Sequence, residues 1–242
     1  MDRLRQPDTP FWVDPGAVDA DRLRLSPEES HHLLRVHRAV PGTPFEATDG
    51  QGAFFECVLE SVERRSAVGR IVARHVDRGE LKIPIQLLVG LPEWRAVEQI
   101  VEHAVPLGVS ALDFAVCERS GREAVGPQRL ARLARIAKAA LKQSRRSRLP
   151  ALASSGMLRS GVQALGPGHR FLADPEGEAF TEDLEQSFQD PIQIAVGPPG
   201  GFDEGERRLL LDSGFTPISL GPSRLTTETA CLAAISLLRN AL

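Results

Sequence analysis

The sequence predicts an α/β protein in which a small, mostly β region precedes a larger region of alternating strands and helices. Up to Val76, short apolar runs are separated by glycine and proline turn signals, a pattern typical of hairpins and small sheets. From Ile83 onward, apolar strands alternate with helical segments, which is typical of a parallel sheet. The pattern changes at Arg78–Lys82, so we expect two domains, residues 1–77 and residues 78–242.

Turn signals divide the first region into short elements. The signals are Pro41-Gly42, Asp49–Gly52 and Gly69. The apolar runs Phe54–Leu59 and Ala67–Ala73 between them predict strands. Pro27–Val36 predicts a short helix, with Ser26 as its N-cap and Glu29 completing a capping box.

The second region opens with a complete β-α-β unit. Ile83–Val89 and Ala111–Val116 are apolar and predict strands, and Glu93–Val105 carries its apolar residues at helical spacing. Further strands are predicted at Phe171–Asp174, Ile192–Val196 and Pro217–Leu220, and further helices at about Glu204–Asp212 and about Glu228–Leu238. The Gly-rich stretch Gly156–Gly168 predicts a surface loop.

Two helices have distinctive faces. In the helix that begins at Pro127, the apolar residues are expected to face the core, which turns the basic residues outward. These apolar residues are Leu130, Leu133, Ala134, Ala137 and Leu141. The final helix is apolar on all sides and too short to span a bilayer, so we expect it in the core or at a subunit interface.

Composition excludes several classes of protein. Hydrophobic residues make up 42% of the chain and the mean hydropathy is -0.16, so wholesale disorder is excluded. The chain starts without an apolar leader and has no apolar run long enough to cross a bilayer, so we expect a cytoplasmic protein with no membrane partner. The spacing of Cys57, Cys117 and Cys231 excludes a Cys-x-x-Cys metal or redox site, and we expect buried thiols and no metal.

Basic residues are concentrated in one stretch, although the formal net charge is -3. Residues 118–150 carry 10 basic and 2 acidic side chains, a net charge of +8. Such a concentration can bind nucleic-acid phosphates, and the alternative is a solvated helix face.

Two strand-loop-helix junctions near the carboxyl end carry the clearest ligand-binding signal. Gly197-Pro-Pro-Gly-Gly-Phe202 follows an apolar strand and precedes Asp203 and Glu206, which have capping-box spacing. Two of its glycines allow close approach of a ligand to the backbone, and the alternative is an ordinary turn. Because the second junction, Ile218–Ala230, follows directly, both loops can wall one pocket. Neither matches a dinucleotide or triphosphate fingerprint.

Four motifs in order resemble a known family. They are Glu118-Arg-Ser120, Gln143-Ser144 with Arg148-Leu-Pro150, Gly197–Phe202 and Leu220–Ala230. They look like the motifs of the bacterial 16S ribosomal RNA uridine N3-methyltransferases of the SPOUT superfamily, the RsmE family. His32–Arg38 with Pro41-Gly42 is similar to the family's N-terminal stretch, so the resemblance covers nearly the whole chain.

The resemblance implies a SPOUT-type α/β domain with a trefoil knot that binds S-adenosylmethionine, preceded by a small PUA-like β-barrel that helps hold RNA. It also implies a homodimer and 16S ribosomal RNA of the small subunit as the substrate. The implied cofactor-binding residues are Leu172, Gly197, Pro198, Gly200, Gly201, Leu220, Gly221, Leu225, Thr227 and Ala230.

For the reaction, we expect Arg224 to stabilise the developing uracil anion and Glu228 to accept the proton. The alternatives are a phosphate contact or a solvated loop for Arg224, and complementation of the helix dipole for Glu228. The residues expected to contact RNA are Arg38, Arg119, Arg122, Lys142, Arg145, Arg146 and Arg148.

The sequence departs from the family pattern at several of these sites. Pro199 and Lys142 stand where the family has Glu, Arg145 where it has Gly, Ser223 and Thr226 where it has Arg, and Pro92–Arg95 where it has Lys-Gly-Asp. These departures leave open a second function, an RNA-binding or ribosome-assembly protein with lost or altered methyltransferase activity. A nicotinamide-dependent enzyme would need a glycine fingerprint after the first strand, which Gly90–Trp94 does not provide.

Overall fold

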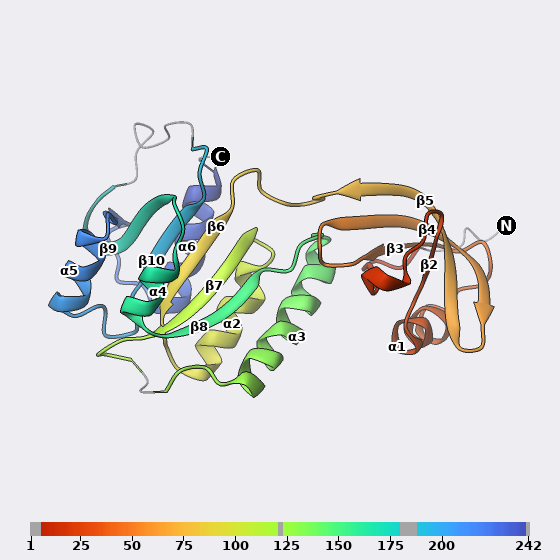
Figure 1. Ribbon diagram of the computed structural model, residues 1–242, viewed down its shortest axis with the longest axis horizontal. Coiled ribbons are helices and arrows are strands. Elements are labelled where there is room, and N and C mark those ends of the chain that lie inside the picture. Colours follow the sequence, from red (N-terminus) through yellow and green to blue (C-terminus); the bar gives the residue numbers. More distant parts are fainter. Residues whose placement is uncertain (1–5, 121–122, 180–187, 241–242) are drawn as a thin grey trace. The chain divides into compact units, whose positions relative to one another are not determined.

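The computed structural model describes residues 6–120, 123–179 and 188–240, and the chain divides into two compact units (Figure 1). Unit 1 is Met1–Glu80 with Lys138–Leu149, and unit 2 is Leu81–Ala137 with Pro150–Leu242. The mixed α/β fold predicted from the sequence is confirmed. The division differs from the expected domains at residues 138–149, which join unit 1 because their basic side chains bind its acidic residues.

Unit 1 is built on a five-stranded sheet in the order β1-β3-β4-β5-β2. β1 runs parallel to β3, and the remaining pairs are antiparallel. Its elements before residue 80 are β1 (Phe11–Trp12), the 3-10 turn η1 (Pro15–Ala17), β2 (Arg22–Arg24), α1 (Pro27–His31), the π-helical turn η2 (His32–Val36), β3 (Pro44–Thr48), β4 (Ala53–Glu63) and β5 (Ser66–Val76). The two strands predicted in this region lie within β4 and β5.

The predicted capping box of α1 is half present. The Ser26 hydroxyl accepts a hydrogen bond from the Glu29 backbone N–H, at 3.2 Å. The Glu29 carboxylate does not return to the Ser26 backbone, because it binds the Lys142 ammonium at 2.7 and 2.9 Å.

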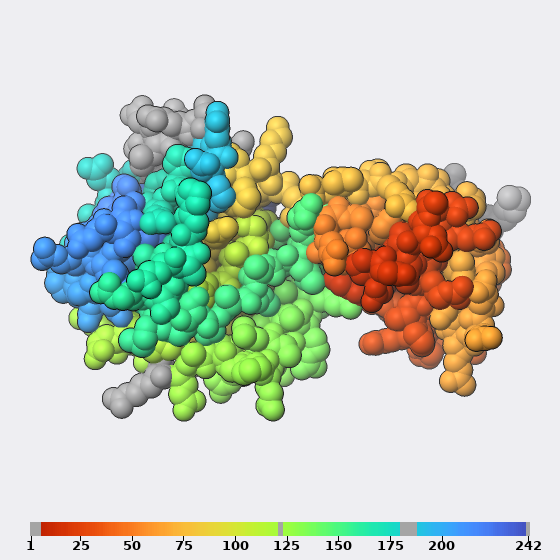
Figure 2. All heavy atoms as spheres, viewed as in Figure 1, coloured from red at the N-terminus to blue at the C-terminus, as the bar shows by residue number. Residues whose placement is uncertain are grey.

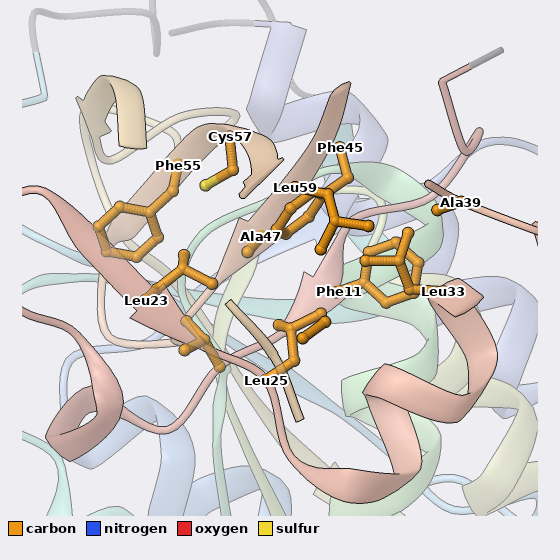
Figure 3. Packing of buried hydrophobic residues seen from close by; sticks show 12 residues of the cluster. Phe11, Leu23, Leu25, Leu33, Ala39, Phe45, Ala47, Phe55, Cys57 and Leu59 are labelled. Atoms are coloured by element: carbon orange, nitrogen blue, oxygen red, sulfur yellow. The ribbon is translucent and has the colours of Figure 1, made fainter. Parts of the chain in front are cut away.

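The core of unit 1 lies between the sheet and the helical segment α1–η2 (Figure 3). The rings of Phe11 and Phe45 meet edge to face with centroids 5.8 Å apart, and Leu33 from η2 is fully buried beside them. This apolar packing covers one face of the small sheet.

Unit 2 contains a parallel six-stranded sheet in the order β11-β9-β10-β6-β7-β8. From β6 the chain adds β7 and β8 on one side, and then β10, β9 and β11 occupy the other side. The carboxyl ends of all six strands therefore lie at one edge. The elements are β6 (Ile85–Gly90), α2 (Trp94–Ala104), β7 (Val109–Val116), α3 (Pro127–Ser144), β8 (Ala151–Met157), α4 (Leu158–Ala164), β9 (His169–Ala179), β10 (Ile192–Val196), α5 (Glu204–Asp212), β11 (Thr216–Ser219) and α6 (Thr227–Asn240).

Helices cover both faces of this sheet. On one face, α4 and α5 pack with Leu88, Leu172 and Ala195 in a common apolar cluster. α4 lies on the side of unit 2 turned to the viewer in Figure 2, where its atoms are teal. On the other face, α2 and α6 pack together, and α6 contacts β10 and β6.

The prediction of a surface loop over Gly156–Gly168 is wrong, because this stretch contains the end of β8 and the whole of α4. Leu158 and Val162 are buried against the sheet. Gly161 allows the close packing, because a Cβ at this position would lie 2.7 Å from Leu88 Cδ1. The glycine that permits this approach is also a loop signal in the sequence, so the local pattern does not predict this short helix.

Two predicted helix faces differ in detail. In α3, Leu133, Ala137 and Leu141 are buried as expected, but Ala134 is exposed and Ala140 is buried in its place. The helical repeat explains this, because Leu133, Ala137, Ala140 and Leu141 form one stripe. In α6, one stripe is buried and the opposite side is half-buried.

Candidate functional site

The first ligand-binding loop predicted from the sequence, Gly197–Phe202, connects the carboxyl end of β10 to α5. The Gly201 N–H donates to the Pro198 carbonyl at 2.7 Å, which closes a turn with Pro199 at its second position, where proline is favoured. Pro199 is exposed, and Gly201 has a φ of +73°, a conformation that favours glycine.

This loop lies directly on the ends of β6 and β7. A Cβ at Gly90 would be 2.4 Å from Pro198 Cδ, 2.7 Å from Pro198 N and 3.1 Å from Cys117 Sγ. The missing side chain of Gly90 therefore creates the space in which Pro198 sits. The sequence contains the glycine, but its partner is 108 positions away in the chain, so its role could not be recognised from the sequence.

Side chains from three other elements hold the loop. The Thr227 hydroxyl, at the start of α6, donates to the Gly197 carbonyl at 3.0 Å. Arg119 Nη1, from the segment after β7, donates to the Gly200 carbonyl at 3.0 Å. Asp203 and Glu206 form the predicted capping box of α5, and Glu206 also accepts the Glu118 backbone N–H at 2.7 Å.

The second loop runs from Leu220 to Thr226, between β11 and α6. Gly221 has a φ of +118°, a conformation that L side chains rarely adopt. α6 begins at Thr227, and the hydroxyl of the preceding Thr226 lies 3.0 Å from that of Thr229.

A cavity of 390 Å³ opens beside the second loop. Its lining combines apolar groups with a few polar ones, as in sites for small organic ligands. The lining residues are Ala179, Ser219, Leu220, Gly221, Ala233, Ser236, Leu237 and Asn240. Sequence reasoning missed the four from α6, although their spacing of three and four residues marks one helix face.

The structure brings together part of the predicted cofactor set. The first loop and Thr227 are joined by a hydrogen bond, and Leu220 and Gly221 line the cavity. Leu172 lies in the apolar cluster under α4, so its side chain packs in the core. Leu225 and Ala230 are half-buried next to the start of α6. The cavity lining includes the second loop and no residue of the first.

The two predicted catalytic residues, Arg224 and Glu228, lie in or next to the second loop. Arg224 is exposed within the loop, and Glu228 is half-buried in the first turn of α6. In the ranges 6–120, 123–179 and 188–240, neither has an ion-pair partner.

The end of the basic stretch, residues 138–149, forms ion pairs inside unit 1. Lys142 binds Glu29 at 2.7 Å, and both side chains are less than one-fifth exposed. Arg145 lies 3.2 Å from Glu46, which is itself buried. Arg148 binds Asp77 at 2.5 Å while remaining half-exposed.

Arg146, which the sequence predicts to contact RNA, is buried in the structure. Its side chain is 3% exposed and binds Glu80. The other Glu80 oxygen accepts the backbone N–H groups of Ser147 and Arg148 at 3.0 and 2.9 Å. Arg38 is exposed, with a φ of +54°, and Arg122 lies outside the described residues.

The three cysteines are free and buried, as predicted. Burial raises the pKa of Cys57 to about 12, and burial together with the Glu206 carboxylate raises the pKa of Cys117 to about 12. Burial also raises the pKa of Cys231.

The described residues hold no group of three or more His, Cys, Asp or Glu that could bind a metal ion. None of the described helices is both long and apolar enough to cross a membrane.

Comparison with known proteins identifies the family. Residues 79–239 match the RNA methyltransferase domain family, and residues 25–72 match the RNA methyltransferase PUA domain family. The chain belongs to this family of RNA methyltransferases. The match to the PUA family covers α1, η2 and the strands from β3 to most of β5.

Relatives within the RNA methyltransferase family confirm the resemblance seen in the sequence. The chain is 28% identical over 231 residues to the ribosomal RNA small subunit methyltransferase E of Synechocystis sp., covering 93% of this chain and 75% of the relative. Two solved structures are also similar. A probable rRNA-methyltransferase from Porphyromonas gingivalis has a TM-score of 0.81 and 29% identity, over 96% of this chain and 98% of that one. A putative methyltransferase from Legionella pneumophila, in complex with S-adenosylmethionine, has a TM-score of 0.80 and 27% identity, over 96% and 98%.

Proposed function

We propose that this chain is an S-adenosylmethionine-dependent methyltransferase that acts on N3 of a uridine in 16S ribosomal RNA. The observation that carries the proposal is the hydrogen bond from Thr227 to the Gly197 carbonyl, which joins the two predicted ligand loops in a chain of the RNA methyltransferase family. The relative named ribosomal RNA small subunit methyltransferase E and the Legionella structure with bound S-adenosylmethionine support the same activity and cofactor.

The residues present fit this cofactor. The 390 Å³ cavity beside Leu220 and Gly221 is within the range of roughly 300–1,000 Å³ found for small-ligand sites. Ser219, Ser236 and Asn240 supply polar groups in an otherwise apolar lining. We expect the first and second loops, with Thr227, to hold the cofactor mainly through backbone groups. When bound, S-adenosylmethionine supplies an electrophilic methyl group.

The protein's part in catalysis is proposed to be positioning and electrostatics. N3 of the uridine must lose a proton before it attacks, and the proposed acceptor is Glu228, at the start of α6 next to the second loop. Arg224 in that loop would stabilise the negative charge that develops on the uracil ring. Hydrogen bonds already fix the Gly197 and Gly200 carbonyls, so little reorganisation of the first loop is needed on binding.

RNA is proposed to contact the exposed cations of unit 1. Among the predicted contacts, Arg38 is exposed, and Arg145 and Arg148 remain 42% and 51% exposed despite their ion pairs. The match to the RNA methyltransferase PUA domain supports a role of unit 1 in holding RNA, and we propose that its sheet closes as a PUA-like barrel. Lys142 and Arg146 are too deeply placed in internal ion pairs to contribute in this arrangement.

Two finer features of the fold are part of the proposal. A trefoil knot is supported by the chain path, because β11 lies outside β9 while α6 returns to pack on β10 and β6. A homodimer is supported by the half-buried side of α6, where Leu232 lies next to the cavity-lining residues Ala233 and Leu237. The proposed substrate places the activity in the cytoplasm, where ribosomes are assembled.

Titration calorimetry with S-adenosylmethionine, followed by mass spectrometry of nucleosides from 16S RNA incubated with protein and cofactor, tests the proposal. We expect saturable binding and new N3-methyluridine. Cofactor binding without methyl transfer to any ribosomal RNA would contradict the proposed reaction. Absence of cofactor binding together with retained RNA binding would favour the second function, an RNA-binding or ribosome-assembly protein.

A further inference from the structure

Arg119 lies along the first ligand loop over the length of its side chain. Its Nη1 donates to the Gly200 carbonyl at 3.0 Å. A Cβ at Gly200 would lie 3.0 Å from Arg119 Cβ and 3.2 Å from Arg119 Cδ, so the aliphatic part of the arginine packs on the glycine. The contact therefore depends both on the guanidinium and on the absence of a side chain at position 200.

The peptide group between Gly200 and Gly201 is held at both of its polar atoms. Arg119 binds its oxygen, and its N–H donates to the Pro198 carbonyl at 2.7 Å. Glycine loses more conformational freedom than any other residue when it is ordered, so two consecutive glycines are costly to fix. A side chain that fixes this peptide before a ligand arrives lowers the ordering cost of binding.

Glu118, next to Arg119 in the chain, contacts the carboxyl end of the same loop, where α5 begins. The Glu118 backbone N–H donates to Glu206 Oε1 at 2.7 Å, while Glu206 Oε2 accepts the Asp203 N–H at 2.9 Å. The segment after β7 thus contacts the loop at Gly200 and the helix cap that follows it. One contact lies within the loop, at Gly200, and the other lies after it, at Glu206.

Two backbone donors of the loop take no part in the hydrogen bonds of the described residues. Pro198 and Pro199 have no N–H, and Gly201 and Asp203 use theirs within the protein. Within the part of the chain that the structure describes, the backbone N–H groups of Gly200 and Phe202 have no acceptor. These two groups are adjacent to the peptide that Arg119 fixes.

We propose that Arg119 is a positioning residue of the methyl-donor site, which orders the Gly197–Phe202 loop for S-adenosylmethionine, and that its charge does not serve as an RNA phosphate contact. This inference rests on the proposed function and assigns to Arg119 a role different from the RNA contact expected from the sequence. Arg119 is exposed, so a phosphate could reach it, and the two roles must be separated by experiment.

The test compares Arg119→Ala and Arg119→Lys with Arg208→Ala in the full-length protein. Arg208 is a matched control, because it is an exposed arginine of unit 2 whose one ion pair, with Asp212, is long at 3.9 Å. Calorimetry gives the affinity for S-adenosylmethionine without turnover. Fluorescence anisotropy with a 16S RNA fragment at several salt concentrations gives RNA affinity and its salt dependence.

For Arg119→Ala we expect cofactor affinity to fall about tenfold, with RNA affinity and its salt slope unchanged. Arg119→Lys should recover part of the loss, since an ammonium can also donate to the Gly200 carbonyl, and Arg208→Ala should match the wild type. If Arg119→Ala unfolds, Arg119→Lys carries the test, with a smaller loss of cofactor affinity and an unchanged salt slope.

Unchanged cofactor affinity in the folded variants overturns the inference, whether or not RNA binding weakens. A salt slope lowered by about one unit in Arg119→Ala would show a phosphate contact and also overturn it. Failure of the wild-type protein to bind S-adenosylmethionine would instead overturn the proposed function, so the two failures are distinguishable.

Discussion

The hydroxyl of Thr227 donates a hydrogen bond to the carbonyl oxygen of Gly197 at 3.0 Å, so the first turn of α6 is tied to the loop that follows β10. The two residues are 30 positions apart in the chain and belong to different ligand loops. Thr227 is 4% exposed, and Gly197 is half-buried. The bond therefore couples the geometry of one loop to that of the other.

Thr227→Val should weaken S-adenosylmethionine binding about tenfold, because the Gly197 carbonyl loses its donor and the first loop is released from α6. A buried acceptor left without a partner also costs about 1–3 kcal/mol of folding free energy. Calorimetry and urea unfolding measure the two effects. Thr227→Ser, which keeps the hydroxyl, should retain most of the affinity, and an equal loss in both variants would contradict the role of the hydrogen bond.

Gly90→Ala should displace the first loop, because the added Cβ would lie 2.4 Å from Pro198 Cδ and 2.7 Å from Pro198 N. The backbone of Pro198 cannot move without shifting the turn, so we expect cofactor affinity to fall by at least about tenfold. Gly126→Ala is the control, because a Cβ there meets nothing within 4 Å. Wild-type affinity in Gly90→Ala, measured by calorimetry, would separate the first loop from the cofactor site.

The sequence predicted helices, strands and loops better than it predicted which distant residues pack against them. The helix predicted from about Glu204 to Asp212 agrees with α5, and the strand predicted at Ile192–Val196 agrees with β10, because a capping box and an apolar run are local signals. The helix α4 escaped prediction because Gly161, which reads as loop-forming, is in fact what lets the helix approach Leu88. Local sequence patterns do not show which distant residues would clash with a side chain at a glycine position.

The basic stretch, residues 118–150, shows that local sequence also fails to predict the ion-pair partners of charged residues. Its net charge of +8 along the sequence favours a phosphate-binding face, but its main acidic partners come from far away in the chain. Lys142 binds Glu29 across 113 residues, and Arg146 binds Glu80 across 66. Only the fold shows that the positive charge of residues 138–149 is used to attach this segment to unit 1.

Glu80→Ala should destabilise unit 1 by about 3–5 kcal/mol, because it removes the carboxylate that binds the buried Arg146 guanidinium. The same change removes the acceptor of the Ser147 and Arg148 backbone N–H groups. Glu63→Ala is the control, since the Arg24 and Glu63 side chains are about half exposed and such pairs contribute less than about 1 kcal/mol. Similar urea midpoints for the two variants would show that the Glu80 contacts do not stabilise the fold.

The buried thiols should make the protein less stable at alkaline pH. The pKa of Cys57 and of Cys117 is raised from 9.0 to about 12, mainly by burial. Because a raised pKa favours the neutral thiol in the folded state, its contribution to stability is complete below pH 9 and is lost as the pH rises from 9 toward 12. Urea unfolding should show the loss, and Cys117→Ala should reduce it. A thiol reagent at neutral pH should modify none of the three cysteines in the folded protein.

Arg38→Ala and Arg146→Ala should affect RNA binding in different ways, because only the first side chain is exposed. A residue that neutralises one phosphate contributes about one unit to the salt slope of RNA affinity, so Arg38→Ala should lower the slope by about that amount and leave stability unchanged. Arg146→Ala should instead lower the urea midpoint, since Glu80 loses its buried partner, with the salt slope of the remaining folded protein preserved. Anisotropy titrations at several salt concentrations, made well below the unfolding temperature of each variant, separate the two effects. A reduced slope for Arg146→Ala at full folding would mean that its ion pair with Glu80 opens when RNA binds, and that the basic stretch exchanges an internal carboxylate for a phosphate.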